Sequence, residues 1–238
     1  MFSKPFFDLQ FTFAERVSTL SGIPLPSALL DYTNLYVRLG LGRNFDSKHN
    51  GWQTYLAGLV DNTDVRAWTY QCYVRNAEVN TSPVVEAAFG CFSYAILSTG
   101  EAKLHFRNSA MNVSSPLSRA SYDQRRAELS LLFAHLKATR GSDVVVAGSS
   151  WLYNLNAYTR LFPREYVANV QVVHGRYQSM ARWGQFVDYR GQLIADVAVA
   201  FLKSLQRAQS FEELDACFAF QTLAVSAPAQ TFYDFLGI

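Results

Sequence analysis

The strongest structural signal in the sequence is a long apolar segment, residues 83–97, followed by a polar turn and an alternating stretch. The segment is apolar on both sides, which is typical of a strand buried in the middle of a sheet. Residues 98–101, Ser-Thr-Gly-Glu, predict a hairpin turn. Residues 102–108 then alternate, with Leu104 and Phe106 on one side and polar side chains on the other. We therefore expect a hairpin that belongs to a sheet.

Helical periodicity dominates the residues before this hairpin. Thr12 and Glu15 have the spacing of a capping box, and we expect the helix that they begin to end at Gly22. Further helices are predicted over 27–39, 52–60 and 64–79.

Helices and strands are mixed after the hairpin. Ser121 and Gln124 form a second capping box, which predicts a strong helix to Thr139. The later elements are predicted as a strand over 143–147, a turn over 148–150, a helix over 152–162, a strand over 166–173, and helices over 192–208 and 211–218.

This order predicts an α+β or α/β protein, with a helical N-terminal region packed on a mixed, largely antiparallel sheet flanked by helices. We expect one globular unit over 1–238, with a helical subregion over 1–82 and a mixed α/β subregion over 83–238 that share one core. The 238 residues are half hydrophobic and only 17% charged, so the chain can bury enough apolar surface to fold.

Charge and composition exclude several classes of partner. The net charge of +2 comes without a basic cluster, so nucleic acid is not an expected partner. The three cysteines and four histidines are widely spaced, and we expect neither disulfides nor a metal site. Because the chain has neither a signal-peptide pattern nor an apolar span of membrane length, we expect no membrane association and a cytoplasmic location.

Residues 89–163 resemble the central part of the GNAT acyltransferase superfamily in the order of their elements: hairpin, loop, long helix, strand, turn and short helix. The short helix carries Asn154, Ala157 and Tyr158, similar in composition to an Asn/Ala/Tyr pattern of that family. At the place of the family's phosphate loop the chain has the residues Gln124 to Leu129, without the two glycines of the family pattern.

The resemblance implies a coenzyme A thioester as cofactor and acyl transfer as the reaction. It implies that the amides at the start of the long helix, around Ser121, Arg125 and Arg126, hold the pyrophosphate, because helix N-termini bind phosphate. It implies that Tyr158 is the acid that protonates the leaving thiolate.

Two local patterns also indicate an anion site. Lys103, His105 and Arg107 present cationic or hydrogen-bonding groups on one side of a strand, so His105 is a candidate base and Arg107 a candidate anion ligand. The alternative is the solvated face of a half-exposed strand. Ser149 and Ser150 follow a predicted strand and precede a helix, where hydroxyls and amides can hold an anion; the alternative is an ordinary helix N-cap.

The best functional hypothesis is an enzyme that binds a small anionic substrate or cofactor, most concretely an acyltransferase. One alternative is a non-catalytic scaffold whose aromatic residues form a homodimer interface. Another is a serine hydrolase that uses Ser150 with His105 or His174. The Gly-x-Ser-x-Gly motif of such enzymes is incomplete, because Leu152 stands where its last glycine would be. Glu128 is expected to be a surface ion-pair partner of Arg125 or Arg126.

Overall fold

The computed structural model describes residues 1–76, 84–108, 115–174 and 181–238, and divides the chain into two compact units. Unit 1 consists of Met1–Ser82 and His174–Phe220, and unit 2 of Pro83–Val173 and Gln221–Ile238. Each unit has its own cluster of buried apolar side chains. The change from helices to strands predicted near residue 83 therefore coincides with the first boundary between the two units. Residues 174–220, assigned above to the α/β subregion, belong to unit 1 instead.

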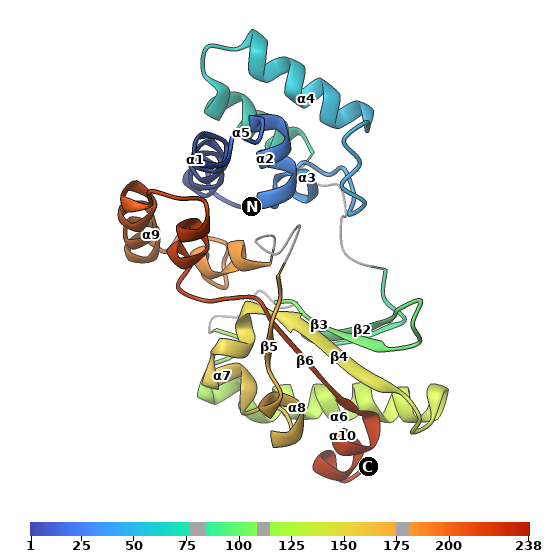
Figure 1. The fold of residues 1–238 in the computed structure, drawn as a ribbon. Helices are drawn as coiled ribbons and strands as arrows, with labels where there is room; N and C mark the ends of the chain where they lie inside the picture. The colour runs from blue at the N-terminus through green and yellow to red at the C-terminus, as the bar shows by residue number, and fades with distance from the viewer. Residues whose placement is uncertain (77–83, 109–114, 175–180) are drawn as a thin grey trace. The chain divides into compact units, whose positions relative to one another are not determined.

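Unit 1 is helical and is arranged around its first helix, which contacts α2, α5 and α9 (Figure 1). Its helices are α1 (Lys4–Ser21), α2 (Leu25–Tyr32), α3 (Leu35–Arg38), α4 (Asn50–Asp61), α5 (Val65–Arg75) and α9 (Ala195–Arg207), with the 3-10 turns η4 (Arg182–Phe186) and η5 (Glu212–Cys217). The core is rich in aromatic rings; Phe13, for example, lies 5.5 Å from Trp183 and 5.8 Å from Phe201 between ring centroids.

Two helices of unit 1 begin or end at residues other than those predicted from the sequence. Helix α1 begins at Lys4, because Pro5 suits a first turn, and Thr12 lies inside it and bonds to Asp8, so the expected capping box is wrong. The end at Gly22, which has a φ of 73°, is confirmed. The helix predicted over 27–39 is two helices, because the backbone is extended at Thr33, where α2 ends; the Thr33 hydroxyl accepts the N–H of Leu35, the first residue of α3.

Unit 2 is an α+β fold built on a six-stranded mixed sheet with the order β1-β2-β3-β4-β6-β5. Its strands are β1 (Ala87–Phe89), β2 (Phe92–Ile96), β3 (Ala102–Phe106), β4 (Val145–Ser150), β5 (Gln171–Val172) and β6 (Leu223–Pro228). Only β3 and β4 pair in parallel, and the other neighbours are antiparallel. This confirms the predicted mixed, largely antiparallel sheet flanked by helices.

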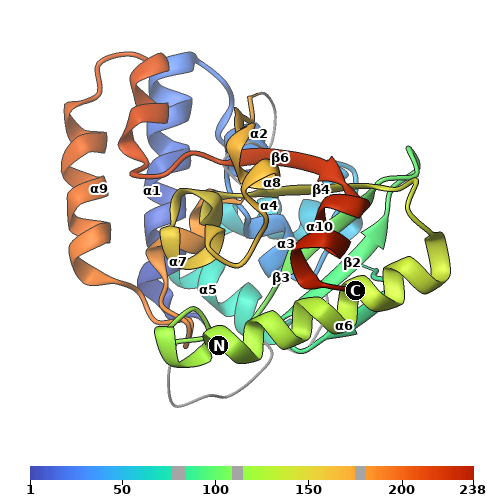
Figure 2. The same cartoon turned by 90° about the horizontal axis from the view of Figure 1, so that it is seen from below.

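The helices of unit 2 lie on one face of this sheet. They are η1 (Arg119–Ser121), α6 (Tyr122–Arg140), η2 (Trp151–Asn154), α7 (Asn156–Thr159), α8 (Arg164–Ala168) and α10 (Ala229–Leu236). The long helix α6 and the short C-terminal helix α10 contact each other on this face, and their rings Phe133 and Phe232 stack with centroids 4.3 Å apart (Figures 1 and 2). Alternate strand residues, including Tyr94, Leu104 and Val146, are buried in this cluster.

Three predictions in unit 2 are corrected. Residues 84–97 form a hairpin and not one strand, because Gly90 adopts a φ of 59° and turns the chain between β1 and β2. Residues 166–173 are not one strand: residues 166–168 are the end of helix α8, and only β5 is strand. The Ser121 side chain bonds to Ser118 and Ser115 and does not cap α6, so the second capping box is also wrong. The hairpin turn before β3 and the helix ending near Thr139 are confirmed.

Candidate functional site

The two parallel strands of unit 2 separate at their C-terminal ends. Strands β3 and β4 pair over three positions, the last of which joins Leu104 and Gly148. Beyond it, His105 still pairs with Ser93 of β2, and Ser150 still pairs with Leu223 of β6. The outer edges of both strands are thus held in the sheet while their inner edges stop pairing with each other.

A small pocket of about 110 Å³ lies at this opening. It brings together four of the side chains singled out from the sequence, namely His105, Ser149, Ser150 and Tyr158. The other residues that line it are Leu104, Phe106, Leu152 and Tyr153. The carboxyl ends of strands are where open α/β sheets bind their ligands, so the place suits a binding site.

The serine pair comes from the end of β4. Residues 148–150 are strand and not the expected turn. The Ser150 hydroxyl accepts the N–H of Leu152 at 3.1 Å and starts η2, which confirms the helix-cap interpretation of this residue. Ser149 points to the other side of the strand and is exposed. Of the two serine hydroxyls at the pocket, that of Ser150 is therefore held by a backbone N–H and that of Ser149 is exposed to solvent.

A cluster of buried tyrosines lies at the inner side of the pocket, with Tyr153 and Tyr158 lining it and Tyr166 in contact with Tyr153. The hydroxyl groups of Tyr153 and Tyr166 lie 2.8 Å apart, and the ring of Tyr158 lies 5.2 Å from that of Tyr153. Burial raises the pKa of Tyr158 well above its ordinary value, and the neighbouring Tyr153 raises it further. Tyr158 is therefore a phenol that stays protonated and can donate.

Gly148 makes room for this cluster. A Cβ atom at Gly148 would lie 1.9 Å from the Tyr153 hydroxyl and 2.4 Å from that of Tyr166. The sequence analysis missed Tyr153, Tyr166 and this role of the glycine. The available signal was a glycine inside a β-branched strand, which often marks a close approach of other atoms to the backbone.

The cationic side of β3 is only partly brought to the pocket. His105 lines it, and Lys103 lies on the same side of β3, two residues before it. Arg107 follows the last residue of β3, is exposed and does not line the pocket. His174 lies outside the pocket as well and is also exposed.

The three candidates at the start of α6, Ser121, Arg125 and Arg126, lie elsewhere. Arg125 is only 1% exposed, and its guanidinium donates to Cys91 Sγ at 2.8 Å and to the Glu128 carboxylate. Glu128 is buried too and accepts the N–H of Cys91, so the expected surface ion pair is an internal one. Arg125 is thus directed into the protein and away from any anion at the start of α6, because its charge is already paired.

Ser121 and Arg126 also have internal contacts. The Ser121 hydroxyl is buried against Ser118 and Ser115. The Arg126 guanidinium lies 4.1 Å from the centroid of the Phe235 ring, on α10. The structure does not bring either residue to the pocket between β3 and β4.

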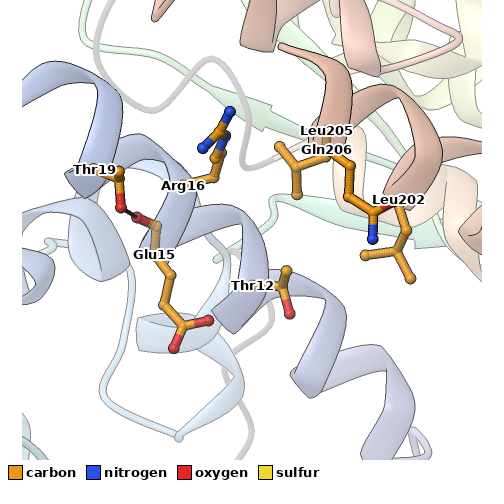
Figure 3. Close-up of a pocket in the computed structure, with 7 residues that line it drawn as sticks. All are labelled: Thr12, Glu15, Arg16, Thr19, Leu202, Leu205 and Gln206. Carbon is orange, nitrogen blue, oxygen red and sulfur yellow. Dashed lines mark hydrogen bonds between the residues drawn. The ribbon is translucent and has the colours of Figure 1, made fainter. Parts of the chain in front are cut away.

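Unit 1 has a larger groove between α1 and α9, with a volume of about 340 Å³ (Figure 3). Arg16 donates from its guanidinium to the carbonyl of Ala208, at the C-terminal end of α9. Glu15 is paired with Arg66 at 2.6 Å. The charges that line this groove therefore hold the helices of unit 1 together.

Metal ligands are not grouped in the described residues, where no three His, Cys, Asp or Glu side chains come together as a metal site. Among the same residues, none of the helices has the length and apolar character needed to cross a membrane. Comparisons with protein-family models, with curated proteins and with solved structures found no match for this chain.

Proposed function

We propose that unit 2 binds an acyl thioester of coenzyme A where β3 and β4 separate, and transfers the acyl group to an amine or another nucleophile. The observation that carries the proposal is the single pocket lined by His105, Ser149, Ser150 and Tyr158 at the end of the parallel pair. The order of elements over residues 89–163 supports the same reaction through its resemblance to the GNAT superfamily.

The separated strand edges suit the arm of coenzyme A. That arm is an extended chain with two amide groups ahead of the thiol. An extended chain with amides can bond to an open strand edge in the way an added strand does. The inner edges beyond Leu104 and Gly148 are two such edges facing one opening. The phosphate end of the cofactor, expected near Ser121 and Arg126, stays a prediction.

The pocket residues then take separate roles. His105 accepts the proton of the attacking amine, and the new bond forms to the thioester carbonyl carbon. As the C–S bond breaks, Tyr158 donates its proton to the leaving sulfur. A phenol is protonated at neutral pH, as an acid must be at the start; the raised pKa of Tyr158 keeps the proton on but makes the phenol a weaker acid.

The binding step is tested by adding coenzyme A and acetyl-coenzyme A to the whole protein in a thermal melt and in a calorimetric titration. Because a ligand that binds only the folded state stabilises it, we expect a higher melting temperature and a saturable heat of binding. No binding at about 1 mM coenzyme A, the upper end of the usual KM range, would contradict the proposal.

A matched pair of variants localises the effect. Ser149→Trp places a large ring at the mouth of the pocket and should abolish coenzyme A binding. Ser226→Trp makes the same change on β6, where Ser226 pairs with Ala147 and is exposed on the same sheet but does not line the pocket. Equal binding by both variants would place the cofactor elsewhere.

A second candidate function, a serine hydrolase, is favoured by one observation: Ser150 and His105 line the same pocket. A fluorophosphonate distinguishes the two. Covalent labelling at Ser150, lost in Ser150→Ala, would support the hydrolase. An absence of labelling together with coenzyme A binding would support the transferase.

A further inference from the structure

Helix α9 of unit 1 has two contrasting sides. Its inner side carries Ala198, Phe201 and Leu205, which are buried in the core beside α1. Its outer side carries Asp196, Val199, Ala200 and Lys203. Asp196 is three residues from Val199 and four from Ala200, and Lys203 is four and three from them, so the four residues form one row along the helix surface, with Val199 and Ala200 side by side at its centre. Val199 is 49% exposed at the centre of this row.

The charges at the two ends of the row have no partner within the helix. Asp196 and Lys203 are seven residues apart, about 10 Å along the axis, which is too far for an ion pair. Within the part of the chain that the structure describes, neither residue takes part in an ion pair. The row therefore has an acidic residue at one end, two apolar residues at its centre and a basic residue at the other end. Both charged side chains are exposed and can pair with a second molecule.

This row is complementary to itself. If a second α9 lies antiparallel across it, Val199 of each copy meets Ala200 of the other. Asp196 then meets Lys203 at both ends. A two-fold dimer interface requires this property, since the same patch must fit its own copy.

A hollow beside the row can accept the exposed valine of a second copy. It has a volume of about 420 Å³, and Ala200, Ala216 and Ala219 lie along it with Phe186 and Phe201. The small side chains leave room for a valine from another helix. Aromatic side chains are a less suitable basis for a dimer interface. Among the described residues, Phe235 is the one exposed Phe, Tyr or Trp side chain of the large hydrophobic residues.

We propose that the outer face of α9 is a homodimer interface in which two copies of this helix pair antiparallel, with Asp196 of each copy bonded to Lys203 of the other. A single helix pair buries less than a standard interface, so the dimer is reversible and its Kd is micromolar or weaker. This interface is separate from the proposed cofactor pocket, which lies in unit 2.

Sedimentation equilibrium of the whole chain, from low micromolar to about 1 mM, tests the dimer. The wild-type protein should dimerise with rising concentration. Asp196→Lys and Lys203→Asp each place like charges opposite one another at both ends, and each should raise the dimer Kd by about tenfold or more. Asp123→Lys, the same charge change in the first turn of α6, should leave the Kd unchanged.

The double variant Asp196→Lys/Lys203→Asp separates the interface from local helix effects. Asp196 in the first turn and Lys203 toward the last turn also suit the dipole of α9, so the double change weakens the isolated helix further. The proposed contact is restored by the swap, however, and the Kd should return to within about threefold of wild type.

Three results would overturn the proposal: a monomer at every concentration, a dimer unaffected by either single change, or a double variant that stays folded by circular dichroism but does not regain the dimer.

Discussion

At the scale of single residues, the candidate pocket depends on the absence of one side chain. Gly148 lies in the middle of β4, and the two hydroxyls of Tyr153 and Tyr166 fill the space where its Cβ would be. These hydroxyls are buried and bonded to each other, so they have little freedom to move aside. The position of the tyrosine cluster is thus set by the backbone of the strand.

Gly148→Ala should therefore lower the free energy of unfolding by about 1–3 kcal/mol, as overpacking does in other cores. Adding Tyr153→Phe should recover part of this loss, because it removes the hydroxyl that meets the new methyl group. Chemical denaturation measures both changes. The control is Ser149→Ala, one residue along on the exposed side, with an expected change of about 0.5 kcal/mol or less. A Gly148→Ala protein as stable as this control would contradict the packing.

The buried tyrosines also predict how stability depends on pH. Burial raises the pKa of Tyr153, Tyr158 and Tyr166 in the folded protein, whereas in the unfolded chain a tyrosine ionises near pH 10. Below pH 10 both states keep the proton and the stability is unaffected. Above pH 10 the unfolded state loses protons that the folded state retains, so the free energy of unfolding falls as the pH rises.

Urea midpoints measured from pH 8 to 11 should show this alkaline loss of stability. The loss should be smaller in a Tyr153→Phe/Tyr166→Phe protein than in Tyr189→Phe, which changes a partly exposed tyrosine. Absorbance at 295 nm supplies the second readout. Ionisation of every tyrosine near pH 10 in the still-folded protein would show that the cluster is not buried as described.

The sequence analysis predicted four of the eight pocket residues and missed the rest for a clear reason. Ser149, Ser150 and His105 stand out because polar groups at strand ends suggest binding. Tyr153 and Tyr166 look like ordinary core aromatics, and only the three-dimensional contact with Gly148 gives them a role. Arg125 was assigned to the cofactor through the resemblance to the GNAT superfamily; the spacing indicated Glu128 as an ion-pair partner but not that the pair is buried.

At the scale of elements, the first hairpin of the sheet is fastened to α6 by a buried ion pair. Glu128 of α6 accepts the N–H of Cys91 at 3.0 Å and the guanidinium of Arg125. Its carboxylate lies against Gly90, where a Cβ would be 2.1 Å from it. The turn between β1 and β2 is thus shaped around a charge supplied by the helix.

Arg125→Met should destabilise the protein by about 3–5 kcal/mol, because it leaves the Glu128 carboxylate buried without its counter-charge. Arg125→Met/Glu128→Gln should regain a large part of this, since the amide oxygen can still accept the Cys91 N–H. Arg140→Met is the matched control: it breaks a second arginine–glutamate pair, with Glu86, whose side chains are nearly half exposed, and should cost about 1 kcal/mol or less. Equal losses in Arg125→Met and Arg140→Met would show that the α6 pair is not buried.

Strongly periodic elements were predictable, and elements that depend on distant partners were not. Helix α6 and the β2–β3 turn follow local patterns, and both are observed. Strand β6 was missed, because its residues become a strand by pairing with β4 and β5, which lie far away in the sequence. The same distance between partners hid the hairpin within 84–97, whose turn rests on Glu128.

At the scale of the whole molecule, unit 2 is interrupted in the sequence but continuous in its sheet. The chain leaves after β5, builds part of unit 1 with residues 174–220, and returns as β6 beside β5. The N–H of Val173 bonds to the carbonyl of Thr222 at 2.9 Å, so the departing and returning chains are neighbours. Composition revealed the boundary near residue 83. The return of 174–220 to unit 1 was not predicted, because it depends on packing against α1, which lies far away in the sequence.

The central claim is that the ends of β3 and β4 hold an acyl thioester, and backbone amide chemical shifts of the whole protein, recorded while coenzyme A is added, test it most directly. The account predicts saturable shifts concentrated at His105, Phe106, Ser149 and Ser150, with the amides of α1 and α9 in unit 1 unchanged. Shifts centred in unit 1, or none at millimolar coenzyme A, would contradict it.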